Sequence, residues 1–344
     1  MNKQDFFALP MADQIRSLKA ALEILPPISI FGNADPKTRY RNLSAMYHPD
    51  KWRNDPIVYP LAEDLQIALN LEWEEYMKGG AGQGGLLLGK GDIADIYLDG
   101  RNVKKVSRGD NDLIEWEADV LKILNAQPDY ETGAQFYVPR LVGLSYDDND
   151  MAVNTITYSE DVSPEELFSL KQLAVAYDFA PPIKALGWIW RRVLAALSLG
   201  HRIGVIHGAV TPDHIMLKPG IAGEKQHRGF VIDWAMSARN DSAVLVLSTD
   251  WSDLYPPEAL RKLPATPAFD AYVAAKSMLW AFHNMPRPMQ RYFERCTAES
   301  NFGRGWKIVE LFNQWDDVMY GELGWNKEFV PLNFAAVDWS WWNA

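Results

Sequence analysis

The spacing of apolar residues changes twice along the chain, and the first stretch, residues 1–78, follows a helical period. Between residues 37 and 47, Tyr40, Leu43 and Tyr47 fall on one helical face. A second amphipathic helix of about four turns follows, with apolar positions at Leu61, Leu65, Ala68, Leu69 and Tyr76. Two adjacent prolines and a Gly-Asn-Ala-Asp-Pro turn separate an earlier helix from the helix at residues 37–47. The pattern predicts a small helical domain in which two antiparallel helices flank a short polar loop.

A glycine-rich run follows this domain and has the composition of a flexible linker, which we place at residues 79–87. Beyond it the period changes. Residues 88–162 alternate like short strands around one helix near Leu113 to Leu124, whereas residues 163–344 are mostly helical. The chain is therefore predicted to be α+β, with an N-terminal helical domain, a small strand-rich lobe and a larger helical lobe.

Composition narrows the class of protein. The chain has 344 residues, of which 48% are hydrophobic and 23% charged, as in globular proteins. A net charge of -11 argues against a broad nucleic-acid surface. Cys296 is the single cysteine, so neither an internal disulfide nor a cysteine metal cluster can form. There is no secretory signal pattern and no apolar run of about 18 residues. We expect a cytoplasmic protein without nucleic-acid or membrane partners.

The loop after the helix at 37–47 reads His48-Pro49-Asp50. Pro49 stiffens the loop and presents His48 and Asp50 outward, while the basic face carrying Arg39 and Arg41 suits an acidic partner. This segment resembles the second helix and His-Pro-Asp loop of J-domains. The resemblance implies that the partner is a chaperone of the heat-shock seventy class, whose ATPase J-domains stimulate. The alternative is an ordinary helix cap with a solvated aspartate.

Residues 84–90 nearly spell a phosphate-binding P-loop, but Gly91 stands where a magnesium-binding Ser or Thr is needed. Residues 88–97 instead resemble the glycine-rich loop of protein kinases. In that resemblance, Gly89 and Gly91 allow the backbone to fold closely over nucleotide phosphates. Ala94 replaces the third glycine, and a simple hairpin is the alternative.

The next matching segment is a strand in which Val103 and Lys105 share one face. The resemblance implies that Lys105 reaches a nucleotide and pairs with a glutamate on the following helix. Glu117 has the spacing expected of that glutamate, and Glu115 is the alternative.

Three later segments keep the family order. Residues 195–217 resemble a helix and the catalytic loop, 231–235 the metal-binding motif with Asp233, and 255–258 the end of the activation segment. Asp270 resembles the buried aspartate that braces the catalytic loop. Arg304 is the candidate partner of Glu258.

Several positions depart from the kinase pattern. Ala209 stands in place of the catalytic aspartate, and a methyl group cannot accept a proton. His214 stands in place of the asparagine that ligates the second metal ion, and imidazole prefers softer ions than magnesium. Thr211 replaces the loop lysine. Gly208 replaces the arginine that reads an activation-loop phosphate, so no conventional phosphorylation switch is expected despite Ser248 and Thr249 nearby.

Lys105, Glu117 and Asp233 survive, and the resemblance implies that these residues hold nucleotide and metal. The pattern predicts a pseudokinase of weak or no activity, for which the resemblance implies ATP and magnesium as cofactors, with Asp233 and His214 at the metal positions. Asp213 is a candidate substitute base, and His207 a structural histidine.

Three hypotheses follow. The chain is a co-chaperone that recruits a chaperone and binds a client, an active phosphotransferase with a non-standard loop, or a purely structural kinase fold. The arrangement is similar to chaperone–kinase fusions of bacterial viruses. The tryptophan-rich C-terminus, with Trp339, Trp341 and Trp342, is expected to pack on the helical lobe or to form a partner-binding patch.

Overall fold

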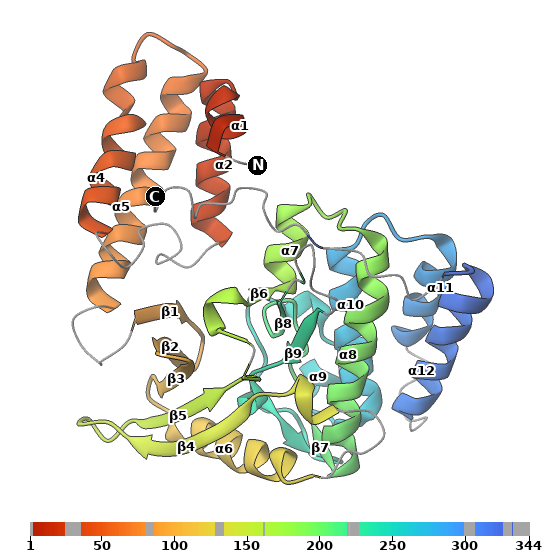
Figure 1. Ribbon diagram of the computed structural model, residues 1–344. Coiled ribbons are helices and arrows are strands. Elements are labelled where there is room, and N and C mark those ends of the chain that lie inside the picture. The colour runs from red at the N-terminus through yellow and green to blue at the C-terminus, as the bar shows by residue number, and fades with distance from the viewer. Residues whose placement is uncertain are drawn as a thin grey trace. The chain divides into compact units, whose positions relative to one another are not determined.

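The structure is a computed structural model, and it describes most of the chain in two compact units (Figure 1). The described residues are 3–24, 36–79, 86–127, 134–160, 162–218, 220, 227–298, 307–325 and 332. The first unit is drawn from Met1–Gly91 and Asp95–Gly100, and the second from Asp92–Ala94 and Arg101–Asn333. Helices and antiparallel strands occur together, so the predicted α+β class is confirmed. Arg304, most of the predicted linker and the C-terminal tryptophans lie outside the described residues.

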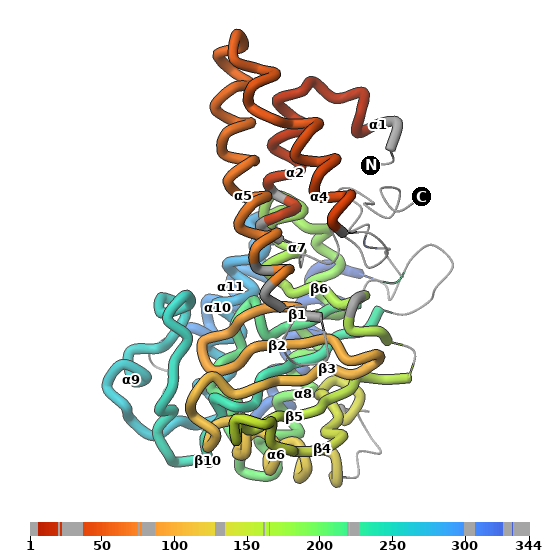
Figure 2. The backbone as a smooth tube through the Cα atoms, turned by 90° about the vertical axis from the view of Figure 1, so that its left-hand side faces the viewer, coloured from red at the N-terminus to blue at the C-terminus, as the bar shows by residue number. Residues whose placement is uncertain are grey.

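The first unit is mainly helical. Its elements are α1 (Lys3–Ala8), α2 (Met11–Ile24), α4 (Pro36–Met46), the 3-10 helix η1 (Pro49–Trp52), α5 (Val58–Gly79), β1 (Leu86–Lys90) and β2 (Ala94–Asp99). Helices α2, α4 and α5 lie side by side in both views of the backbone (Figures 1 and 2). The helix predicted at about four turns is longer, because α5 has 22 residues, or about six turns. The two predicted helices correspond to α4 and α5, and they form one bundle together with α1 and α2.

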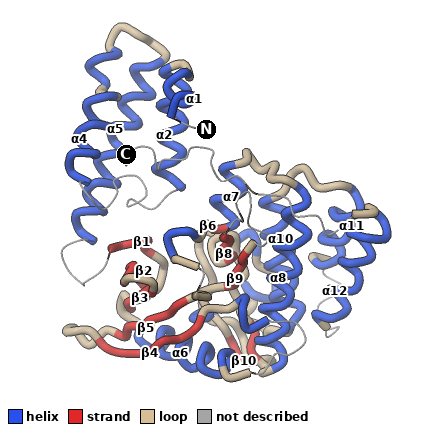
Figure 3. The backbone as a smooth tube through the Cα atoms, viewed as in Figure 1, coloured by secondary structure: helices blue, strands red, loops and turns tan. Residues whose placement is uncertain are grey.

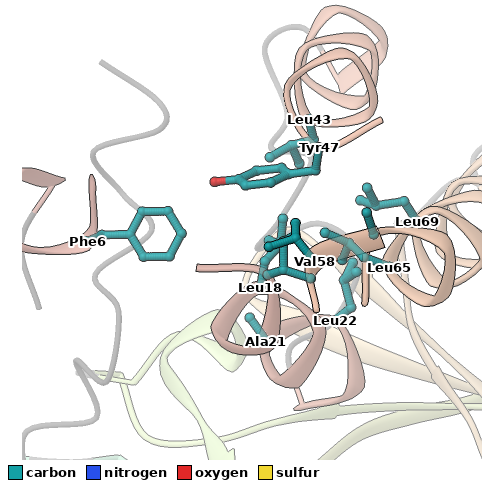
Figure 4. Packing of buried hydrophobic residues seen from close by; sticks show 11 residues of the cluster. Phe6, Leu18, Ala21, Leu22, Leu43, Tyr47, Val58, Leu65 and Leu69 are labelled. Carbon is teal, nitrogen blue, oxygen red and sulfur yellow. The ribbon is translucent and has the colours of Figure 1, made fainter. Parts of the chain in front are cut away.

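The core of this bundle is made by the apolar faces that the periodicity predicts (Figure 4). Leu43 from α4, Tyr47 directly after α4, and Leu65 and Leu69 from α5 are buried. They pack with buried residues of α1 and α2, namely Phe6, Ile15, Leu18, Ala21 and Leu22. Tyr40 is partly buried and stacks on the Trp73 ring, with the ring centroids 4.8 Å apart. The predicted interior faces of both helices are confirmed.

The second unit contains the remaining strands and helices. Its strands are β3 (Asn102–Ser107), β4 (Arg140–Tyr146), β5 (Ala152–Thr157), β6 (Phe168–Ser169), β7 (Val205–Ile206), β8 (Ile215–Lys218), β9 (Arg228–Val231) and β10 (Ala238–Arg239). Its α-helices are α6 (Asn111–Asn125), α7 (Leu170–Ala176), α8 (Ile183–Arg202), α9 (Pro257–Leu260), α10 (Pro267–Ala281), α11 (Arg287–Cys296) and α12 (Ile308–Asp316). Short 3-10 segments are η2 (Ala134–Tyr137), η3 (Pro164–Glu166), η4 (Trp234–Met236) and η5 (Ser252–Leu254), and η7 (Asp317–Glu322) is π-helical.

Within this unit β3, β5 and β4 are antiparallel neighbours, and β6, β8 and β9 form a separate three-stranded sheet. From α7 onward helices predominate, as Figure 3 shows in blue. Aromatic residues tie three of them together, because Trp190 of α8 donates to the Tyr292 hydroxyl of α11 at 2.9 Å. That hydroxyl donates to the Leu311 carbonyl of α12 at 3.0 Å. Across the described residues, we find no helix whose length and apolar character would let it cross a membrane.

Candidate functional sites

The His48-Pro49-Asp50 loop lies between α4 and η1 and carries two exposed polar side chains. His48 caps η1, and its Nδ1 accepts a hydrogen bond from the Asp50 amide at 3.3 Å. Pro49 occupies the first position of η1, where its missing N–H costs nothing. The side chains of His48 and Asp50 are 47% and 60% exposed, so both are open to a partner. Proline at this position agrees with the predicted stiffening, whereas the His48 cap and the exposed Asp50 also agree with the alternative of an ordinary helix cap.

The charges around this loop are partly paired. Arg53 donates to Asp50 Oδ1 from Nη2 at 2.7 Å and from Nε at 3.0 Å, so two donors share one carboxylate oxygen. On α4, Arg41 is exposed, whereas Arg39 is only half-buried and its pKa is lowered by that burial. The basic face therefore presents Arg41 more fully than Arg39.

A second group of charged residues is buried in the second unit and centres on Lys105. The Nζ atom of Lys105 lies 3.2 Å from Glu117 Oε2 and also contacts Asp233 Oδ1. Lys105 is on β3, Glu117 on α6, and Asp233 directly precedes η4. The predicted ion pair between Lys105 and Glu117 is present, and Asp233 joins it. Glu115, the alternative, instead accepts a hydrogen bond from the exposed Tyr146 hydroxyl.

Local sequence explains how these three side chains meet. On β3, Lys105 shares one face with the buried Val103 and lies opposite Asn154 of β5 in the strand register. On α6, Glu117 belongs to the buried stripe that includes Ile114, Ala118 and Leu121. Asp233 adopts a left-handed conformation with φ of 63°, which turns the chain sharply into η4. Strand alternation thus directs Lys105 inward, helical period directs Glu117, and the left-handed turn places Asp233.

The Glu117 carboxylate accepts hydrogen bonds from two further donors besides Lys105. Its Oε1 accepts from the Trp234 amide at 3.0 Å, and its Oε2 accepts from Asn154 Nδ2 at 3.2 Å. Asn154 is fully buried and also donates to the Ile114 carbonyl at 2.8 Å. The sequence reasoning missed Asn154, although it is the single amide in a strand that otherwise holds apolar residues and threonines.

Burial and neighbouring charges shift the pKa values of Lys105 and Asp233 in opposite directions. Burial alone would lower the pKa of Lys105, but the carboxylates of Asp233 and Glu117 outweigh it and raise that pKa above its usual value. Burial alone would raise the pKa of Asp233, but Lys105 and then His214 outweigh it and hold that pKa well below its usual range. Lys105 is therefore a cation and Asp233 an anion at neutral pH.

The loop from His207 to His214 is braced by Asp270 at the start of α10. Asp270 is fully buried, and its carboxylate accepts from the amides of His207 and Gly208, each at 2.8 Å. His201 Nε2 also lies 2.8 Å from this carboxylate. The prediction that Asp270 is buried and braces the loop is confirmed. His201 was not predicted, because nothing in its helical surroundings marks it.

Both ring nitrogens of His207 make hydrogen bonds to the main chain. Its Nε2 lies 2.9 Å from the Ile232 carbonyl oxygen, to which it must donate, and its Nδ1 accepts from the Ala209 amide at 3.2 Å. Burial lowers the pKa of His207 to about 4, so the ring is neutral at physiological pH. These contacts give His207 the structural part that the sequence suggested rather than that of a base.

Gly208 and Ala209 occupy positions where a side chain has little room. Gly208 has φ of +82°, and a Cβ built there would lie 2.7 Å from the Met236 carbonyl oxygen. This contact explains why no arginine stands at position 208. Ala209 has no exposed surface, and its carbonyl oxygen lies 2.8 Å from the Thr211 amide. Thr211, in the place of the loop lysine, is buried as well.

His214 links this loop to Asp233. Its Nδ1 lies 2.7 Å from the Ala209 carbonyl oxygen, and its Nε2 lies 3.2 Å from Asp233 Oδ2. The structure thus brings together Lys105, Glu117, Asp233 and His214 from the predicted set. A carboxylate and an imidazole beside a buried lysine form a donor set that fits a divalent cation bound together with phosphate oxygens.

Asp213 lies outside that group. Its Oδ2 accepts from Trp251 Nε1 at 2.8 Å and from Lys171 Nζ at 3.4 Å. Neither partner was predicted, because Trp251 is 38 positions away along the chain. Oδ2 of Asp213 is therefore already engaged by two donors.

Gly89 and Gly91 belong to the first unit, where Gly89 lies in β1 opposite Ile96 and Gly91 follows the strand. A Cβ built on Gly89 would meet no described atom within 4 Å, so local packing does not require glycine there. The cover that these glycines would form over a nucleotide stays a prediction.

Comparison with known proteins adds no family to these observations. The chain matches no protein-family model, and no curated protein matches it.

Proposed function

We propose that this protein is a J-domain co-chaperone joined to a pseudokinase. The first unit recruits a chaperone of the heat-shock seventy class through the His48 loop. The second unit, which resembles the two lobes of a protein kinase in its motifs, holds a nucleotide and transfers no phosphate. This second unit also binds protein clients.

One observation carries the pseudokinase part of the proposal. Lys105 is buried between Glu117 and Asp233, while position 209 holds a methyl group. The acidic side chains around the loop are engaged elsewhere: Asp233 with Lys105 and Asp213 with Trp251. This supports a cleft that retains the groups for phosphate and cation, and in which neither of these two described carboxylates is left unengaged to accept the proton of a hydroxyl.

The J-domain part is tested by ATPase stimulation of a heat-shock seventy chaperone. The full chain is expected to raise the steady-state ATPase rate, and His48→Gln and Asp50→Asn are expected to abolish the increase. Asp13→Asn is the matched control, because Asp13 forms an exposed pair with Arg16 three residues away, as Asp50 does with Arg53. No stimulation by the unaltered chain, or equal loss in the control, would refute this part.

The nucleotide part is tested by thermal unfolding with ATP and either Mg²⁺ or Mn²⁺. Ligand at a hundred times its dissociation constant stabilises the folded state by about 2.7 kcal/mol, so the melting temperature must rise. Asp233→Asn keeps the shape of the side chain and removes its charge, and it is expected to abolish the rise. A purely structural fold predicts no rise for the unaltered chain with either ion.

The active phosphotransferase is the competing function for the same cleft. It requires transfer of label from γ-labelled ATP that Asp233→Asn abolishes. Such transfer would overturn the pseudokinase assignment and leave nucleotide binding intact.

A further inference from the structure

The His214 ring is held in one orientation by the backbone of its own loop. Its Nδ1 lies 2.7 Å from the Ala209 carbonyl oxygen. A carbonyl oxygen can only accept, so Nδ1 carries a hydrogen and donates it. In the neutral ring the lone pair then belongs to Nε2. Histidines that ligate metals are usually anchored in this manner, with the other ring N–H donated to a carbonyl or carboxylate.

Nε2 faces the carboxylate of Asp233. The distance from Nε2 to Oδ2 is 3.2 Å, and both side chains are mostly buried, with about one sixth of each exposed. A nitrogen lone pair and a carboxylate oxygen repel each other at this distance unless a proton or a cation lies between them. Two ligands that each lie about 2.1 Å from one ion, at roughly a right angle, are separated by about 3 Å.

The two oxygens of Asp233 have separate partners. Oδ1 is contacted by Lys105 Nζ, and Lys105 is fixed in turn by Glu117. Oδ2 is left for the His214 side. An ion bound between Oδ2 and Nε2 would therefore leave the buried ion pairs of Lys105 in place.

Given nucleotide binding as proposed above, we infer that the cleft takes its nucleoside triphosphate with a first-row transition ion in preference to Mg²⁺. The protein ligands are Asp233 Oδ2 and His214 Nε2. Magnesium prefers an all-oxygen octahedron, whereas imidazole nitrogen suits transition ions and its affinity rises from Mn²⁺ to Co²⁺.

Asp233 and His214 supply only two ligands, so the nucleotide must supply further ligands to the cation. In the part of the chain that the structure describes, no group of three or more His, Cys, Asp or Glu side chains gathers around a possible ion. The remaining ligands are phosphate oxygens and water, as is usual where one or two side chains hold the cation of a nucleotide. The cation and the nucleotide therefore bind together, and neither binds well alone.

The test is thermal unfolding of the full chain with ATP and a saturating concentration of Mg²⁺, Mn²⁺ or Co²⁺, so that all ATP is complexed. The stabilisation is expected to rise in that order, with an apparent Kd for Co²⁺–ATP at least about tenfold below that for Mg²⁺–ATP. His214→Asn replaces the nitrogen with an amide and is expected to remove the preference. His283→Asn is the control, because His283 is exposed. The visible spectrum of Co²⁺–ATP is a second readout, since a nitrogen ligand shifts its bands in the unaltered chain and not in His214→Asn.

Each failure has a distinct meaning. Equal or stronger stabilisation by Mg²⁺–ATP, or equal stabilisation by ATP with a chelator, would overturn the cation preference and leave nucleotide binding standing. Absence of stabilisation with every ion would overturn nucleotide binding itself. A preference that survives in His214→Asn would overturn the assignment of His214 as the ligand.

Discussion

Gly208 offers a sharp test of the loop geometry, because its backbone conformation and its surroundings both exclude a side chain. Its φ of +82° lies in the left-handed region, and a Cβ there would stand 2.7 Å from the Met236 carbonyl oxygen and 3.1 Å from both Val244 methyl groups. The nearest of these atoms belongs to the backbone and cannot swing away. Gly208→Ala must therefore move the loop against the segment around Met236.

The expected magnitude is the sum of two terms. A left-handed conformation costs a residue with a Cβ about 1–2 kcal/mol, and forcing an extra methyl group into a packed region costs about 1–3 kcal/mol. Gly204→Ala separates them, because Gly204 has φ of +73° and a Cβ there would meet no described atom within 4 Å. Gly204→Ala is expected to pay the first term alone.

The assay is urea denaturation, with unfolding monitored by hydrogen exchange of the peptide that covers residues 205–217. This peptide reports on the second unit alone. Gly208→Ala is expected to lower the free energy of unfolding by about 2–5 kcal/mol, and by about 1–3 kcal/mol more than Gly204→Ala. Equal losses in the two variants would show that the approach of Met236 is not as close as described, and would remove the explanation for the missing arginine.

Three further predictions concern buried polar groups. His207 has its pKa lowered from 6.5 to about 4, so its contribution to stability is present above pH 6.5 and is lost as the pH falls toward 4. The loss is about 3 kcal/mol in unfolding experiments across that range, and a His207→Gln curve parallel to that of the unaltered chain would contradict it. Asn154→Leu removes a donor from the Glu117 carboxylate and is expected to cost about 2–3 kcal/mol in urea denaturation, whereas no measurable loss would show that this hydrogen bond is dispensable. Tyr47→Phe leaves the Gln14 oxygen buried without its 3.3 Å donor and is expected to cost about 1 kcal/mol in thermal unfolding of the first unit, and an unchanged midpoint would argue against that bond.

Periodicity predicted the groups that lie on regular elements. Lys105 could be assigned because strand alternation decides its face, and Glu117 was preferred to Glu115 by its spacing to Leu121, which the structure places in the same buried stripe. Helical period likewise identified Leu43, which lies in the core of the first unit.

Contacts made by irregular segments could not be predicted in this way. The close approach of Met236 to Gly208 and the bond from Trp251 to Asp213 join residues 28 and 38 positions apart through loops. The tautomer of His214 depends on a backbone carbonyl five residues away, and the period of the sequence carries no information about where that carbonyl points.

Hydrogen bonds that do not involve the side chain at position 209 hold the loop that resembles a catalytic loop. The bonds that hold it run from Asp270 to two amides, from His207 to the Ile232 carbonyl, and from His214 to the Ala209 carbonyl. The Asp270 carboxylate, main-chain groups and two histidines thus hold the loop with alanine at position 209. The same His214 bond leaves Nε2 facing Asp233, which joins the braced loop to the buried Lys105 group. Under the proposed function, such a chain loses phosphate transfer and keeps the side chains that we propose to hold a nucleotide with its cation.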